Sequence, residues 1–149
     1  MKIKRLFIAA IMLGCGIAKA DVQVETSCYV HVPRDNTSKH IKLALRTYVD
    51  KELQKEVGAV IQYNGSKETI PLVFRNYRAI DTDSPDLGNY EITRVEVVDK
   101  KLAGEYVFSQ TGAGNTQGKS VTYKKSPTSK PITFMYLGDD EDPACKINK

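Results

Sequence analysis

Short segments in which apolar and polar residues alternate recur along most of this chain, and turn-forming residues separate them. The first segment, VQVETSCYVHV at 22–32, alternates strictly: four valines, Thr26 and Cys28 share one face, and Tyr29 and His31 lie on the other. A period of two residues is typical of a half-buried β-strand. We therefore expect a strand at 22–32 whose valine and cysteine face points into the core.

Further along, an Asn64-Gly65 dipeptide separates two apolar runs, and this dipeptide favours the tight turn of a hairpin. Pro71 cannot donate a ladder hydrogen bond, so its strand is expected at an edge or in an irregular pairing. In NYEITRVEVVD the apolar residues change from one face to the other. This change predicts a β-bulge near Thr93 and Arg94.

The segment at 40–57 fits two structures, because its apolar residues are spaced for either a strand or a helix. We predict a strand to Val49, a polar turn in DKELQK and a second strand from Val57 to Tyr63. The alternative is a helix near 40–57, which would make the protein α+β.

Seven or eight short strands with turns at close intervals predict an all-β fold, either an antiparallel β-sandwich or a small β-barrel. The chain of 149 residues contains no internal repeat and no long linker. Residues 21–149 are therefore expected to form a single β domain.

The first 20 residues have the features of a secretory signal peptide: a basic start, a short apolar run, and Ala18 and Ala20 before a cleavage site. Lipidation at Cys15 is the weaker alternative, because Leu13 stands where bacterial lipoproteins usually have a small residue. The pattern predicts a bacterial protein that is periplasmic or secreted. The apolar run is too short to span a membrane.

Charge excludes one class of partner. The formal net charge of +4 comes from residues 1–20, which hold four of the 22 basic residues and no acidic one, so that 18 of each sign remain. A neutral domain has no electrostatic preference for nucleic acid.

Cys28 and Cys145 are the two cysteines that remain after residue 20. In an oxidising compartment two such cysteines most simply pair, and their wide separation argues against a redox C-x-x-C site. We predict a disulfide that ties the C-terminal tail to the first strand.

No convincing active site is present. His31 and His40 are both expected on polar faces, without a partnered nucleophile or a catalytic motif. The run TGAGNTQGK at 111–119 lacks the following helix that a phosphate-binding loop needs, and it is predicted to be a hairpin loop. The acidic groups in DTDSPD and GDDEDP do not match a calcium-binding template, so neither a metal nor a cofactor is expected.

The leading hypothesis is a non-catalytic domain that binds a protein partner, such as an inhibitor of a hydrolase like lysozyme or an envelope accessory factor. An exposed tyrosine beside arginine is favoured at protein contact surfaces, and polar loops often carry binding residues. The expected contact residues are Tyr77, Arg78, Thr111, Gly112, Gly114, Asn115 and Gln117.

The alternative is a small-molecule-binding β-barrel. It predicts a cavity, whereas protein binding predicts a filled core. The residues expected to line that cavity are Ile41, Leu72, Tyr106 and Phe108.

Overall fold

A computed structural model of the chain describes residues 21–35, 38–80, 88–112, 118–139 and 145. It is all-β, as predicted: eight antiparallel strands follow one another in chain order and close into a barrel when the last pairs with the first. The strands are β1 (Val22–His31), β2 (Ile41–Asp50), β3 (Lys55–Tyr63), β4 (Ile70–Ala79), β5 (Tyr90–Val98), β6 (Lys101–Thr111), β7 (Gly118–Lys124) and β8 (Ile132–Asp139). Of the two architectures expected, the barrel is confirmed.

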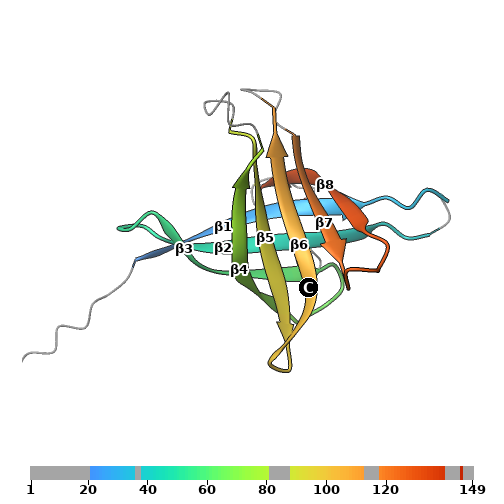
Figure 1. Ribbon diagram of the computed structural model, residues 1–149, viewed down its shortest axis with the longest axis horizontal. Helices are drawn as coiled ribbons and strands as arrows, with labels where there is room; N and C mark the ends of the chain where they lie inside the picture. Colours follow the sequence, from blue (N-terminus) through green and yellow to red (C-terminus); the bar gives the residue numbers. More distant parts are fainter. Residues whose placement is uncertain (1–20, 36–37, 81–87, 113–117, 140–144, 146–149) are drawn as a thin grey trace, which may run out of the picture.

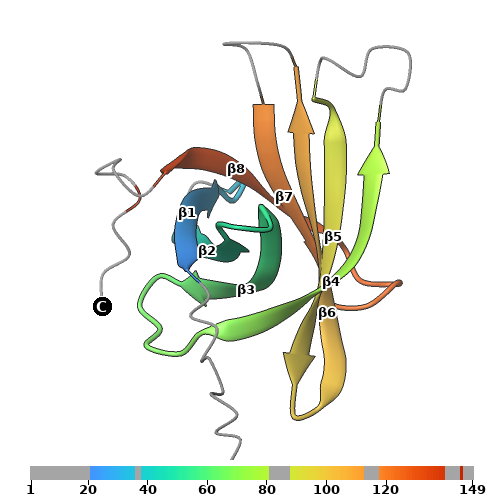
Figure 2. The ribbon, with the colours of Figure 1, turned by 90° about the vertical axis from the view of Figure 1, so that its left-hand side faces the viewer.

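The barrel is flattened into two layers whose strands cross steeply. Figure 1 shows β1 and β2 running across the view while β4 to β7 stand upright, and Figure 2 shows β1 to β3 curling beside the upright sheet. Two connections link the layers. On one side β8 crosses from β7 to β1, and on the other side β3 pairs with β4.

The pairing of β3 with β4 is the shortest in the barrel, and we call it the β3–β4 seam. It comprises Ala59 with Leu72, Val60 with Pro71 and Ile61 with Ile70. The irregular pairing expected at Pro71 is not seen, because Pro71 pairs in regular register with Val60 in the middle of the seam, although it has no N–H to donate. Beyond Leu72, β4 turns away from β3 and pairs with β5.

Residues 41–63 form two strands, so the helical alternative is excluded. The turn between β2 and β3 forms because the Asp50 carboxylate accepts hydrogen bonds from the backbone N–H groups of Glu52 and Leu53, both at 2.9 Å. The next turn contains Asn64 and Gly65, as predicted, with Gly65 at φ +83°, a conformation that glycine adopts without strain.

The interior of the barrel is filled mainly by aromatic and aliphatic side chains from all the strands. The buried residues of this cluster are Tyr29, Leu43, Leu45, Ala59, Ile61, Leu72, Tyr106, Phe108, Val121 and Phe134. Burial of apolar surface on this scale is the main stabilising contribution to a domain of this size.

The expected orientation of β1 is wrong. Tyr29 is the residue that enters the barrel core, whereas Val22 and Val24 are 41% and 50% exposed. Cys28 is buried, but in a second cluster with Ala44 and Cys145 on the opposite face of the strand, outside the barrel. The valine and cysteine face is thus the outer one, and only its middle part is covered.

The bulge predicted near Thr93 and Arg94 lies opposite them, in the partner strand. Phe74 pairs with Arg94 and Asn76 pairs with Thr93, so Arg75 is the extra residue. The change of face inferred for β5 does not occur, because Arg94 and Glu96 continue the inner face after Tyr90 and Ile92. Charged residues on the inner face, rather than a change of parity, explain the sequence pattern.

Cys28 and Cys145 form a disulfide, with their Cα atoms 5.2 Å apart, which confirms the predicted pairing. Cys28 also pairs in register with Gly138 of β8, so the covalent link lies beside the contact that closes the barrel. Among the described residues no helix is long and apolar enough to cross a membrane.

Replacing both cysteines by serine is expected to lower the free energy of unfolding by about 4 kcal/mol, because the reduced chain loses the constraint on a loop of more than a hundred residues. Urea denaturation of the oxidised protein and of the Cys28→Ser/Cys145→Ser variant measures this difference. A loss below about 1 kcal/mol, or two thiols that alkylate in the native protein, would contradict the disulfide's stabilising role.

Tyrosine hydroxyls form a polar cluster inside the barrel. The Tyr63 hydroxyl lies 2.9 Å from that of Tyr106, which donates to Glu96 Oε2 at 3.4 Å. Space for the ring of Tyr123 exists because residue 104 is glycine: a Cβ there would lie 2.6 Å from the ring. Burial, followed by the interaction with Tyr63, raises the pKa of Tyr106.

The buried tyrosines are expected to make stability fall at high pH. Burial is the largest cause that raises the pKa of Tyr29, to about 12, from about 10 in the unfolded chain. The unfolded state therefore loses this proton first, and stability declines as the pH rises from about 10 towards 12. Absorbance at 295 nm is expected to show delayed ionisation that unfolding abolishes. Tyr29→Phe should reduce the decline measured by urea denaturation at pH 8 and pH 11, whereas titration of all eight tyrosines near pH 10 in the folded protein would contradict it.

Candidate functional site

The C-terminal part of β4 lies at an open edge of the upright sheet. Residues 73–79, which we call the exposed β4 segment, pair with β5 from Val73–Val95 to Ala79–Tyr90, but pairing with β3 ends at Leu72. On the side away from β5, the segment has no strand partner among the described residues. An unpaired strand edge presents backbone N–H and C=O groups that another strand can bind.

Large side chains of this segment are exposed on both faces. Val73, Phe74 and Tyr77 are 51%, 55% and 56% exposed. Phe74 pairs with Arg94 and Tyr77 pairs with Ile92, so both aromatic residues lie on the inner face of the sheet. The Tyr77 ring stacks on Tyr90 with 5.7 Å between ring centroids.

The two arginines of the segment are held by acidic residues of the same sheet. Arg75 donates to Glu105 Oε2 at 2.7 Å, and Arg78 donates to Glu91 Oε2 at 2.6 Å. Charged side chains commonly protect sheet edges from unwanted pairing. Here ion pairs within the sheet balance the charges of both arginines. The large side chains of Val73, Phe74 and Tyr77 stay accessible beside them.

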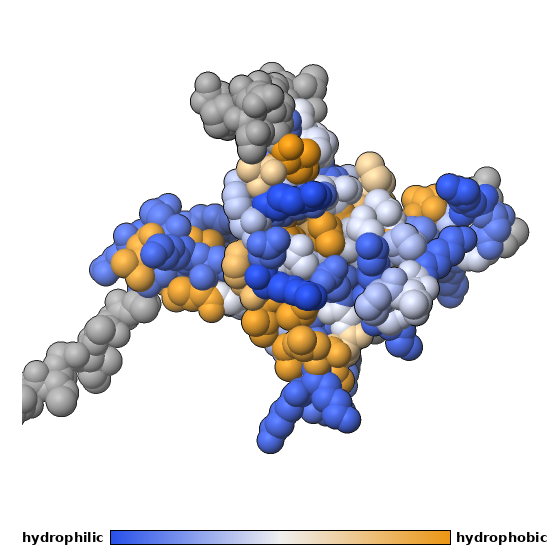
Figure 3. All heavy atoms as spheres, in the orientation of Figure 1, coloured by the Kyte–Doolittle hydropathy of each residue, from blue (hydrophilic) through white to orange (hydrophobic). Residues whose placement is uncertain are grey.

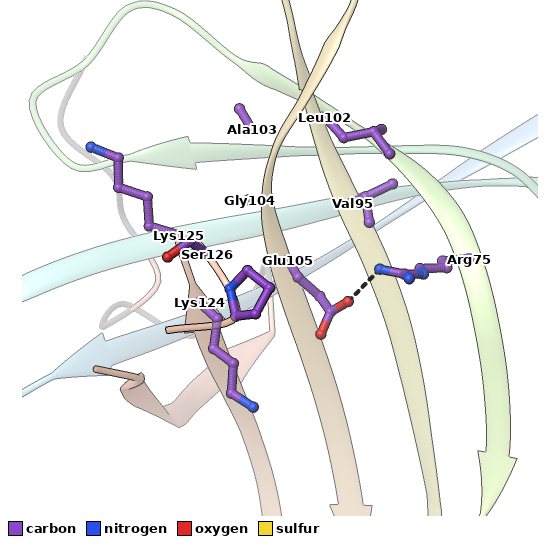
Figure 4. A pocket seen from close by; sticks show the side chains of 10 residues that line it. Arg75, Val95, Leu102, Ala103, Gly104, Glu105, Lys124, Lys125 and Ser126 are labelled. Atoms are coloured by element: carbon purple, nitrogen blue, oxygen red, sulfur yellow. Dashed lines mark hydrogen bonds and ion pairs between the residues drawn. The ribbon is translucent and has the colours of Figure 1, made fainter. Parts of the chain in front are cut away.

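An outer groove of about 410 Å³ continues from this segment across β5 and β6 to the turn after β7. Its lining residues are Arg75, Val95, Leu102, Ala103, Gly104, Glu105, Lys124, Lys125, Ser126 and Pro127. Figure 4 shows the Arg75–Glu105 ion pair on its floor. Figure 3 shows apolar side chains gathered over the lower part of the same sheet, where Val98 and Leu102 are exposed.

The structure brings together four of the predicted partner-binding residues. Arg78 pairs with Glu91, and Glu91 pairs in turn with Ser109, two residues before Thr111. The C-terminal ends of β4 and β6 therefore lie at the same end of the sheet. Asn89 links these ends: its side-chain oxygen accepts the Gly112 N–H at 2.7 Å, and its backbone oxygen accepts the Ile80 N–H at 2.9 Å. Tyr77 and Arg78 are exposed on β4. The predicted residues Gly114, Asn115 and Gln117 lie outside the described residues.

A second hollow, which we call the mouth cavity, lies between the two layers at one end of the barrel and measures about 430 Å³. It is lined by Glu25, Ser27, Tyr29, Leu45, Thr47, Val49, Gln54, Glu56, Tyr90, Ile92, Arg94, Phe108, Ser109, Gln110 and Lys119. Of the residues predicted to line a cavity, Phe108 does so. Leu72 and Tyr106 belong to the filled core, and Ile41 is exposed, so that prediction is otherwise wrong.

Arg94 is the feature of this cavity that the sequence analysis missed. Its side chain is almost wholly buried, and Nε donates to Glu56 Oε1 at 3.0 Å while Nη2 donates to Glu56 Oε2. The guanidinium also lies over the Phe108 ring, 4.8 Å from its centroid. A bidentate ion pair of this kind satisfies a charge that would otherwise be costly to bury.

The two histidines lie apart in different surroundings. His31 Nδ1–H donates to the Thr133 carbonyl oxygen at 2.8 Å, and its ring packs on Phe134. His40 is exposed. The described part of the chain contains no group of three or more His, Cys, Asp or Glu residues that could hold a metal. Most of the two acidic runs, at 81–86 and 139–142, lies outside it.

Removing the Arg94 charge alone is expected to destabilise the protein by roughly 1 to 3 kcal/mol in Arg94→Met, because Glu56 loses its partner and is only partly hydrated at the cavity mouth. The double variant Arg94→Met/Glu56→Leu should recover most of this loss, since neither charge is left unpaired. Arg78→Met is the matched control, and its exposed pair with Glu91 should contribute less than about 1 kcal/mol. Urea denaturation of the four proteins tests this, and a double variant no more stable than Arg94→Met would contradict it.

Comparison of the chain with protein-family models, with curated proteins and with solved structures found no match. The functional assignment therefore rests on the geometry of the exposed β4 segment and of the mouth cavity.

Proposed function

We propose that this protein is a non-catalytic binding domain, acting in the periplasm or outside the cell, that docks a partner protein along β4. The observation that carries the proposal is the exposed β4 segment: six of its seven residues pair with β5 alone, Arg75 being the bulged residue, and the side chains of Val73, Phe74 and Tyr77 are more than half exposed.

The occupant that best fits such an edge is an extended segment of the partner, which adds a strand to the sheet. Backbone hydrogen bonds along the edge then provide affinity, and pockets for alternate side chains provide specificity. Phe74 and Tyr77 offer aromatic surface on one face of the added strand, while Val73 and the outer groove offer apolar surface on the other. Aromatic and arginine residues of this kind are enriched where protein interfaces derive most of their binding energy.

The barrel suits this role because it holds the segment in place without covering it. Tyr77 is fixed against Tyr90, and Arg75 and Arg78 are fixed by their acidic partners, so little side-chain entropy is lost when a partner binds. The bulge at Arg75 interrupts the strand edge, so an added strand is expected to pair regularly along the residues that follow it, Asn76 to Ala79.

Affinity capture from an envelope extract and from a panel of secreted hydrolases, lysozyme among them, tests the proposal. The bait is residues 21–149 in the oxidised form. Replacing Phe74 and Tyr77 by serine is expected to weaken binding of the captured partner more than tenfold, because it removes the aromatic surface beside the edge. Met135→Ser is the matched control, since Met135 is 59% exposed on β8, away from β4.

Hydrogen exchange locates the contact directly. Backbone amides at 73–79 that point away from β5 should exchange quickly in the free protein and become protected in the complex. Equal loss of binding in Met135→Ser, or protection elsewhere than on β4, would overturn the assignment of this surface.

A further inference from the structure

The mouth cavity adjoins the exposed β4 segment at Tyr90, and docking along β4 leaves its other walls unused. At about 430 Å³ it is within the size range of small-molecule sites, and it combines aromatic walls with a few polar groups. Its walls come from both layers of the barrel: β1 to β3 on one side and β5 to β7 on the other.

Tyr29 and Phe108 form the aromatic part of the wall, and Tyr136 packs behind Tyr29 without lining the cavity. Tyr29 packs edge-on against Phe108 at 6.3 Å and against Tyr136 at 5.8 Å between ring centroids. A cation lies over each end of this row of three rings. Arg94 is 4.8 Å from the Phe108 centroid, and Lys119 Nζ is 4.8 Å from that of Tyr136.

The two cations differ in their partners. Arg94 is neutralised by Glu56, whereas Lys119 has no ion pair among the described residues. Contact with an aromatic face uses the positive charge of the ammonium but none of its three hydrogen-bond donors. Lys119 is therefore the group in this cavity best able to bind an anion through charge-assisted hydrogen bonds.

The remaining acidic residue of the cavity lies away from Lys119. Glu25 is exposed and is four residues from Tyr29 along β1, which is roughly 13 Å in an extended strand. Lys119 is near Tyr136, which pairs in register with Tyr29. An anionic group at Lys119 is thus separated from the carboxylate of Glu25, and Glu56 is already paired with Arg94. The carboxylate of Asp139 borders the cavity beside Ser27, whose hydroxyl donates a hydrogen bond to it at 3.0 Å.

We propose that the mouth cavity binds a small organic anion with a flat or apolar body. The anionic group lies at Lys119, and the body packs against Tyr29 and Phe108. Two polar side chains of the rim are already engaged within the protein: the Ser27 hydroxyl donates to Asp139 Oδ1 at 3.0 Å, and Gln110 Oε1 accepts from the Tyr90 hydroxyl at 3.2 Å.

Two fluorescent probes of nearly the same shape test this proposal. Anilinonaphthalene sulfonate carries a flat apolar body with one anionic group, and N-phenyl-1-naphthylamine has the same body without the charge. Titration with the sulfonate should show one site per protein. Lys119→Gln should weaken its binding about tenfold, as expected for loss of one charge-assisted contact, and change binding of the neutral probe less than twofold.

Three variants serve as controls. Lys119→Arg keeps the charge and should retain binding of the sulfonate. Lys124→Gln removes a lysine from the outer groove on the other face of β7, and Leu102→Ser removes an apolar side chain that is 71% exposed, so neither should alter binding. Absence of sulfonate binding, equal affinity of the wild type and Lys119→Gln, or a similar loss in Lys124→Gln or Leu102→Ser would overturn the proposal. None of these outcomes bears on docking along β4.

Discussion

The ion pair between Arg94 and Glu56 links the two layers of the barrel next to the place where backbone pairing between them stops. The β3–β4 seam contains three residue pairs, one of them with a proline that cannot donate a hydrogen bond. Glu56 lies on β3 just outside the seam, and Arg94 reaches it from β5. Because the pair is bidentate and largely buried, it fixes the relative position of the layers at the point where the sheet provides least support.

The separation of β3 and β4 also explains why the two candidate surfaces lie close to each other. Once β4 turns away from β3, its outer backbone edge has no neighbour, which creates the exposed β4 segment. The same separation opens the end of the barrel, so the inner faces of β1 and β5 line a cavity instead of packing together. Tyr90 belongs to both surfaces, because it stacks on Tyr77 and lines the cavity.

Much of the fold could be predicted from local pattern. The period of two residues identified the strands, and the sequence DKELQK and the Asn64-Gly65 dipeptide identified turns, because these features depend on neighbours in the chain. The disulfide followed from the presence of two cysteines.

The orientation of β1 could not be predicted in the same way. Both of its faces are partly buried, one by the core and the other by the segment around Cys145, and alternation alone does not tell these environments apart. Arg94 was missed because a buried charge is acceptable only with a partner, and Glu56 lies 38 residues away. Tyr77 and Arg78 were predicted as partner-binding residues from composition alone, and the free strand edge on which they lie depends on where β3 ends, which local pattern does not give.

The disulfide has a consequence for the way in which the barrel can come apart. A barrel of strands in chain order could begin to unfold at its chain ends, when β1 separates from β8. Cys28 lies within that contact, and its disulfide with Cys145 attaches β1 to the chain beyond β8. The two ends of the barrel therefore cannot move far apart. The barrel must then open first at its other weak point, the β3–β4 seam, where an ion pair rather than a covalent bond resists it. Opening there extends the edge of β4 and widens the mouth cavity while the rest of the chain remains joined as a ring.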